Sequence, residues 1–469
     1  MRKQDMHKLH NKPHMVNGHI VQSRGASHNN RTVTKSKNSS ASTFIILVAA
    51  VALVIVALYA SLTCMRSQLW SSSSSSAQYK TANYSKSAQT FRRRRDEVLA
   101  RKKRAKWLID PNSYAVRAVL EKMSLEDKVA QMFMVKPEDL VGFRRAVISS
   151  GTNVSRAFNS LPVGGVMYSR ENIQNPEQTK RMISGLQAMS QSRVALPAFV
   201  SVDEEGGTVA RISSNPSMGV NPSPNMSDIG ATGKTRKAYE AGQYIGKYLS
   251  DFGFNIDFAP VADVITNPNN ELMKYRSFGS KPNRVKRMAM AFTNGLQASK
   301  VFATYKHFPG HGSTSSDSHQ GVTISNQSSL DLRKTDLVPF KDAVENGVKF
   351  IMVSHVSYPK VTSDETPASM SEKIVTGIAR KKLKYGGILI SDSLGMGAIT
   401  SRYNSGNAAI TGIKAGLDIL LSPANLRQAY YAVVNAVRNG TIPESRINES
   451  VKRIIAIKLQ IANQTKQQK

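Results

Sequence analysis

The stretch Ala198-Phe199-Val200-Ser201-Val202 is followed directly by Asp203-Glu204-Glu205. The first run is apolar on both faces, which is typical of a strand buried in a parallel sheet that helices cover. A half-exposed strand would instead alternate apolar and polar residues. Three carboxylates therefore stand at the end of a predicted buried strand.

Further runs of the same kind, separated by helix-sized amphipathic segments, lie at 163–168, 255–259, 301–304, 350–354, 387–391 and 417–421. Seven or eight strand–helix units over about 350 residues fit a TIM-type (β/α)8 barrel better than an open doubly wound sheet. No GxGxxG or GxxxxGK[ST] motif follows any run, which disfavours a nucleotide-binding fold. The predicted fold class is α/β, a (β/α)8 barrel.

Charged and polar residues follow the predicted strands directly: Asp203-Glu204-Glu205, Asp263, Lys306-His307, His355 and Asp392. In a barrel, the carboxyl ends of all strands meet at one mouth, where active sites are built. Charges that served only solubility would fall on the outer helix faces instead. The sequence therefore predicts an active site at this mouth.

The 469-residue chain has a formal net charge of +32 and one cysteine, Cys64. Such a charge favours anionic partners, but neither zinc-ligand spacing nor a nucleic-acid module is present, so nucleic acid is not an expected partner. A single cysteine excludes an intrachain disulfide. Cys64 only faintly resembles a lipid-attachment site, and we interpret it as an unmodified residue at the end of a membrane helix.

An uncharged run extends from Thr43 to Leu62. About 20 apolar residues span the hydrocarbon layer of a bilayer. A long polar, basic segment precedes the run, which is unlike a cleaved signal peptide. We therefore predict a single uncleaved membrane helix. Lys35 and Lys37 favour an N-terminus inside and a catalytic domain outside the cell membrane.

The predicted organisation has four parts: a basic disordered tail (1–42), a transmembrane helix (43–65), a Ser-rich and Arg/Lys-rich linker (66–110) and a catalytic barrel (111–469). The linker carries a basic run from Arg92 to Lys106. This run is either a solvated stalk or a contact for anionic lipid or wall polymer, and the sequence leaves both interpretations open.

The segment from Lys306 to His319 reads KHFPGHGSTSSDSH. A metal site is disfavoured, because the proline and glycines between His307 and His311 prevent the helix that would place both on one face. Asp317 is close enough in sequence to orient His319, which makes this histidine a candidate proton donor and acceptor. Asp392, at the end of a buried run, is a candidate nucleophile or a helix-capping residue.

Several ordered motifs resemble glycoside hydrolase family 3, and specifically its single-domain β-N-acetylglucosaminidase branch. The resemblance extends from about Met123 to Ile461. It rests on 124–132 as the opening helix, 162–166 as the first strand, 203–211 as the acidic-Gly-Gly turn, 257–263 with 276–279, and the KHFPGH…DSH segment. The Asp-Ser-His ending distinguishes this branch from the β-glucosidases.

The resemblance implies a retaining exo-acting enzyme that removes β-linked N-acetylglucosamine. Asp392 would be the nucleophile, and His319 with Asp317 would be the acid–base pair. The sugar would bind to Asp203, Arg211, Arg276, Lys306 and His307. No metal or organic cofactor is implied.

Thr208, Ser313 and the segment 271–275 depart from the family pattern, which puts the substrate preference in question rather than the activity. The expected partner is a glycan that ends in N-acetylglucosamine, such as a cell-wall muropeptide. Phosphorolysis or β-glucoside hydrolysis at the same site, and a non-catalytic glycan-binding protein, are the alternatives. His355 either lines the pocket or packs behind it.

Overall fold

The computed structural model describes residues 109–315 and 321–466. The chain divides into two units, Met1–Gln89 and Thr90–Lys469, and the first lies wholly outside the described residues. The predicted tail, the membrane helix (43–65) and the basic run from Arg92 to Lys106 lie outside them too. Within the described ranges, no helix is both long enough and apolar enough to cross a bilayer.

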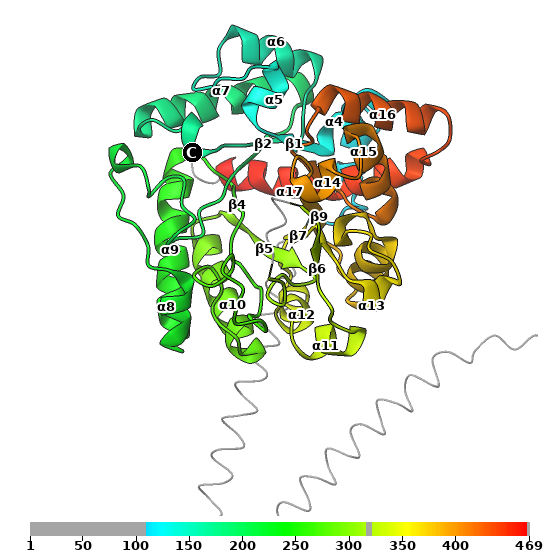
Figure 1. Cartoon of the computed structure of the whole chain (residues 1–469). Helices are drawn as coiled ribbons and strands as arrows, with labels where there is room; N and C mark the ends of the chain where they lie inside the picture. Colours follow the sequence, from blue (N-terminus) through cyan, green and yellow to red (C-terminus); the bar gives the residue numbers. More distant parts are fainter. Residues whose placement is uncertain (1–108, 316–320, 467–469) are drawn as a thin grey trace, which may run out of the picture. The chain divides into compact units, whose positions relative to one another are not determined.

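Eight parallel strands close into a barrel, with β10 paired back to β1 (Figure 1). The strands are β1 (Phe133–Val135), β2 (Gly165–Met167), β3 (Phe199–Val202), β4 (Ile256–Asp257), β5 (Phe302–Phe308), β7 (Phe350–Val353), β9 (Ile388–Ser393) and β10 (Ile419–Leu421). A small separate sheet pairs β6 (Thr323–Ile324) with β8 (Val356–Ser357). The prediction of a TIM-type barrel is confirmed.

All seven predicted strands overlap a strand of the barrel, but the eighth strand, β1, was not predicted. It has three residues and follows α4 (Leu125–Gln131) almost directly, so it is too short to show a periodic pattern. The expectation that 162–166 forms the first strand is wrong, because β1 precedes it in the sequence and pairs with both β2 and β10.

Helices surround the barrel and cover its strands (Figure 1). The longer helices are α7 (Pro176–Val194), α9 (Thr235–Phe252), α10 (Pro282–Ala298), α15 (Ser405–Ala415), α16 (Leu426–Arg438) and α17 (Glu444–Lys466). The shorter ones include α3 (Tyr114–Leu120), α5 (Pro137–Val141), α6 (Thr152–Ser160), α8 (Met226–Ala231), α11 (Ser329–Lys334), α12 (Leu337–Glu345), α13 (Pro359–Thr362), α14 (Gly397–Thr400) and the π-helix η4 (Lys373–Lys382). Their starts follow the expected chemistry: the Ser124 hydroxyl, for example, accepts from the Asp127 N–H in α4.

Helix α17 crosses the amino-terminal end of the barrel (Figure 1) and buries a lysine there. The Lys458 side chain is fully buried, donates to Gln131 Oε1 at 2.6 Å, and lies 5.1 Å from the ring centroid of Phe199, the first residue of β3. Burial lowers the pKa of Lys458 to about 7, because the ammonium form is poorly solvated there.

Replacing Lys458 by methionine is expected to stabilise the protein at low pH. Between about pH 7 and pH 10.5 the unfolded chain binds more protons at this lysine than the folded chain, so the free energy of unfolding rises with pH over this range. Lys458 therefore destabilises the folded protein most below pH 7 and hardly at all above pH 10.5. We expect a gain of about 2 kcal/mol in unfolding free energy at pH 6 and little gain near pH 10. Urea denaturation measures it.

The control is Lys247→Met, because the Lys247 side chain is 73 % exposed and its loss should change stability equally little at both pH values. A loss of stability in Lys458→Met at pH 6 would mean that the hydrogen bond to Gln131 outweighs the cost of burying the ammonium group.

Candidate active site

A cavity of ≈ 1030 Å³ opens at the carboxyl ends of the barrel strands. Six of the eight residues singled out from the sequence line it: Asp203, Arg211, Arg276, Lys306, His307 and Asp392. Three separate strands supply four of them, since Asp203 follows β3, Lys306 and His307 belong to β5, and Asp392 belongs to β9. The other two singled-out residues, Asp317 and His319, lie outside the described residues.

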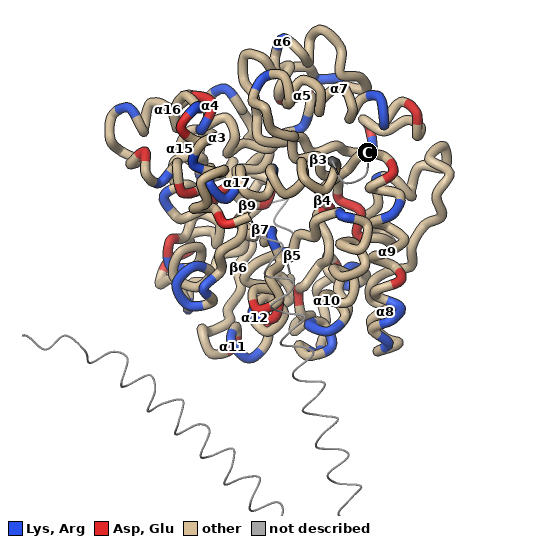
Figure 2. The backbone as a smooth tube through the Cα atoms, turned by 180° about the vertical axis from the view of Figure 1, so that it is seen from behind, with Lys and Arg blue, Asp and Glu red and all other residues tan. Residues whose placement is uncertain are grey.

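A network of ion pairs occupies one wall of the cavity. The Lys306 ammonium lies 2.7 Å from Asp203 Oδ1 and 2.6 Å from Glu205 Oε1. Arg276 binds the same Glu205 carboxylate through two bonds of 2.8 Å, from Nε and Nη2. Figure 2 shows the acidic and basic segments together beside β4. Two cations thus converge on one buried carboxylate, and a second carboxylate, that of Asp203, faces the cavity.

The charges in this network decide the protonation of its members. Burial alone would raise the pKa of Glu205, but the Arg276 and Lys306 charges outweigh it and hold that pKa well below the usual range. Burial would also lower the pKa of Lys306, yet Asp203 and Glu205 raise it. The lysine therefore stays charged at neutral pH and serves as a fixed hydrogen-bond donor rather than as a base.

His307 is held in one orientation by Asp263. Its Nδ1 lies 2.7 Å from Asp263 Oδ2, and its backbone N–H donates to Asp263 Oδ1. The His311 N–H donates to that same Oδ1 at 2.7 Å. Burial, with His307 beside it, lowers the pKa of His311 to about 4. Because Nδ1 of His307 is hydrogen-bonded to Asp263, its other ring nitrogen, Nε2, remains available on the cavity side, 3.5 Å from Arg276 Nη2.

Asp392 lies near the end of β9, partly exposed to the cavity. Its Oδ1 accepts from the N–H of Ser393 at 2.8 Å. His355 lies behind this strand end: it is buried, with Nε2 2.9 Å from the Ser393 carbonyl and Nδ1 2.7 Å from the Ser369 hydroxyl. Of the two interpretations of His355, the structure supports the packed one, because this histidine is not among the residues that line the cavity.

Sequence reasoning did not assign Glu205 or Asp263 to the site. Both had been noted among the charges that follow strands, which is the signal that could have found them. Their partners lie far away in the sequence: Glu205 is 71 residues from Arg276, and Asp263 is 44 residues from His307. Only the closed barrel brings these groups together.

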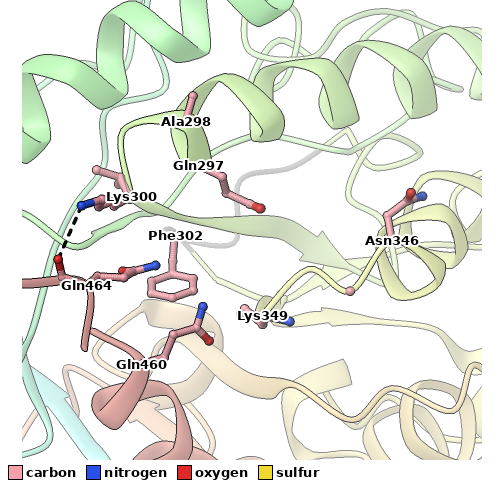
Figure 3. A pocket seen from close by; sticks show the side chains of 10 residues that line it. Gln297, Ala298, Lys300, Phe302, Asn346, Lys349, Gln460 and Gln464 are labelled. Atoms are coloured by element: carbon pink, nitrogen blue, oxygen red, sulfur yellow. Dashed lines mark hydrogen bonds between the residues drawn. The ribbon is translucent and has the colours of Figure 1, made fainter. Parts of the chain in front are cut away.

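A second hollow, of ≈ 310 Å³, lies near the start of β5 and β7 and thus at the opposite end of these strands (Figure 3). It is lined by Phe302, Lys349, Gln460 and Gln464 among others, and burial lowers the pKa of Lys349 to about 8. None of the residues singled out from the sequence lines it. In the described ranges, no group of three or more His, Cys, Asp or Glu side chains is arranged to hold a metal ion.

Comparison with known proteins identifies the family. Residues 124–457 match the sequence profile described as glycosyl hydrolase family 3 N terminal domain. The chain belongs to this family. The match covers the barrel from α4 to α17, and it includes every residue assigned above to the cavity.

Two relatives that resemble the chain carry hexosaminidase names. The chain is 32% identical over 342 residues to "Beta-hexosaminidase A" of Pseudoalteromonas piscicida, covering 68% of this chain and 57% of that protein. It is 35% identical over 270 residues to "Beta-hexosaminidase LpqI" of Mycobacterium tuberculosis, covering 56% of this chain and 68% of that protein. The chain thus spans little more than half of the first of these relatives.

Solved family 3 structures share the fold. A β-N-acetylglucosaminidase from Paenibacillus sp. str. FPU-7 superposes with a TM-score of 0.68 at 33% identity, covering 72% of this chain and 63% of that one. The M. tuberculosis LpqI structure superposes with a TM-score of 0.65 at 29% identity, covering 75% and 97%. The family and the barrel are therefore established by both sequence and structure.

Proposed function

We propose that the protein is a retaining exo-β-N-acetylglucosaminidase. One observation carries the proposal: Asp203, Arg211, Arg276, Lys306, His307 and Asp392 all line one cavity at the mouth of a family 3 barrel. The hexosaminidase names of the relatives support the acetamido sugar as substrate.

In the proposed reaction, Asp392 attacks the anomeric carbon of the terminal sugar and forms a covalent ester, while the bond to the leaving oxygen breaks. His319, oriented by Asp317, gives its proton to that oxygen. His319 then takes a proton from water, whose oxygen attacks the anomeric carbon and releases Asp392. In the sequence, Asp317 and His319 come after β5, the strand that supplies Lys306 and His307.

The remaining polar residues would hold the sugar before the reaction. Asp203 keeps one face toward the cavity, its side chain being 25 % exposed, so its carboxylate is available to sugar hydroxyls. The buried network around Glu205 fixes Lys306 and Arg276 before the substrate arrives. Donors that are already in place lose little conformational freedom on binding, which favours orientation of the substrate.

The cavity volume of ≈ 1030 Å³ is slightly above the range of ordinary ligand pockets, roughly 300–1,000 Å³. It therefore has room for more than the terminal sugar, which fits a glycan such as a cell-wall muropeptide. We propose this substrate class because the cavity leaves space beside the sugar that would contact Asp392.

The test measures release of 4-nitrophenol by the full chain from its β-N-acetylglucosaminide and its β-glucoside, with and without inorganic phosphate. We expect turnover of the acetamido sugar that does not depend on phosphate. Turnover that requires phosphate, or that favours the glucoside, would replace this proposal with the corresponding alternative. A folded protein without turnover of either sugar would support a glycan-binding role.

We further propose that residues 43–65 anchor the protein in the cell membrane, that 66–110 form a linker, and that the barrel (111–469) faces outward. The proposal rests on the uncharged run and the basic residues before it. Protease added to intact cells should then remove the barrel and leave the tail (1–42) protected. If the protease removes the barrel only after the cells are lysed, the barrel lies inside the cell and the orientation is the opposite one.

A further inference from the structure

Glu204 is a fully buried carboxylate next to the cavity but not part of its lining. Its neighbours Asp203 and Glu205 point to the ion-pair network, whereas the Glu204 backbone N–H donates to Asp257 Oδ1 at 3.0 Å. Strand β3 ends at Val202, and the chain after Glu205 folds back on itself, because the Glu205 N–H donates to the Val209 carbonyl at 2.9 Å. Glu204 lies where this segment folds back.

The carboxylate of Glu204 accepts five hydrogen bonds. Its Oε2 accepts from the backbone N–H groups of Arg211 at 2.6 Å and Ile212 at 2.8 Å. Its Oε1 accepts from the Ser213 N–H at 2.9 Å, the Ser213 hydroxyl at 2.6 Å and the Tyr248 hydroxyl at 2.7 Å. Three successive backbone N–H groups therefore point at one side chain, which fixes the backbone of 211–213.

This arrangement bears on the site because Arg211 lines the cavity while its own backbone N–H is bound to Glu204. Hydrogen bonds to a charged acceptor are about twice as strong as neutral ones. In addition, Tyr248 belongs to α9, so the same carboxylate ties the segment to a long helix of the barrel. The direction in which Arg211 leaves the backbone therefore depends on Glu204.

We infer that Glu204 is a positioning residue, which sets the affinity for the sugar by holding Arg211 toward the cavity. The inference rests on the proposed function, in which Arg211 contacts the sugar. It requires a carboxylate and not merely a side chain of this size. A glutamine would present an NH₂ group to donors that need an acceptor, so at least one of the five bonds would be lost.

Two adjacent serines provide a matched pair of alanine substitutions. The Ser213 hydroxyl donates to Glu204, whereas the Ser214 hydroxyl donates to the Ala210 carbonyl at 2.7 Å and does not contact Glu204. Glu204→Gln is expected to raise KM for the β-N-acetylglucosaminide about tenfold and to change kcat less than about threefold. Ser213→Ala should raise KM about threefold, and Ser214→Ala should leave it within about twofold.

The deciding experiment combines Glu204→Gln and Ser213→Ala with Arg211→Ala. If Glu204 acts through Arg211, neither substitution raises KM further once the Arg211 side chain is absent. Increases in KM that persist in the Arg211→Ala background would overturn the inference, as would a fall in thermal stability with KM unchanged. If Glu204→Gln does not fold, Ser213→Ala carries the same test alone.

Failure of the proposed function would look different. If the wild-type chain has no turnover, affinity for N-acetylglucosamine is measured by calorimetry and hydrogen exchange is followed at the amides of 211–213. Faster exchange together with weaker sugar binding in Glu204→Gln would support the positioning role without hydrolysis. Unchanged exchange and unchanged binding would contradict it.

Discussion

Asp392→Asn is expected to lower kcat by on the order of 10⁴-fold, with little change in stability. The amide has nearly the shape of the carboxylate but cannot form the covalent ester with the anomeric carbon. Asp392 is partly exposed to the cavity, and its Oδ1 accepts from the Ser393 N–H at 2.8 Å, a bond that the amide oxygen of asparagine can also accept. Steady-state kinetics on the 4-nitrophenyl β-N-acetylglucosaminide measure the loss.

A matched control separates the nucleophile from other cavity carboxylates. Glu171 lines the same cavity and is exposed, so Glu171→Gln should keep kcat within a few-fold of wild type.

Azide added to Asp392→Ala should restore turnover, because a small anion can attack the anomeric carbon from the side where the aspartate stood. An α-glycosyl azide product would support a retaining reaction. A kcat loss below about tenfold in Asp392→Asn would assign the nucleophile elsewhere.

The parts of the fold that the sequence predicted are those with a local signal. A run such as 387–391 is apolar on both faces because β9 is buried in a parallel sheet, and this property is visible in five consecutive residues. Charges after such runs mark the mouth, because buried strand interiors exclude them. Asp203, Lys306, His307 and Asp392 were found in this way, and the resemblance to the family gave them roles.

The parts that could not be predicted depend on contacts between distant segments. Three adjacent carboxylates, Asp203, Glu204 and Glu205, look alike in the sequence but bind different partners. Asp203 binds Lys306, and Glu204 binds the segment 211–213. Glu205 binds both Lys306 and Arg276. Strand β1 was not predicted, because a strand of three residues is too short to show a periodic pattern of apolar residues. Asp317 and His319 lie outside the described residues, so their predicted roles stay predictions.

Glu205→Gln is expected to cost about 3–5 kcal/mol of unfolding free energy, the range typical of a buried ion pair that loses one partner. The Glu205 side chain is 1 % exposed and is bound by Lys306 and by both Arg276 bonds. A neutral amide would leave the Lys306 ammonium with Asp203 as its remaining ion-pair partner and would remove the carboxylate that accepts both Arg276 bonds. Urea denaturation at pH 7 measures the change.

The pH dependence of this loss has a defined sign. Arg276 and Lys306 hold the pKa of Glu205 well below its usual value of 4.5, so the stability that Glu205 adds is complete above about pH 4.5 and is lost as pH falls further. The difference in unfolding free energy between wild type and Glu205→Gln should therefore be constant around neutral pH and become smaller in acid. Asp203→Asn is the control: its side chain is 25 % exposed and Lys306 keeps Glu205, so we expect a loss of about 1 kcal/mol. Equal losses in the two variants would mean that Glu205 is not the centre of the network.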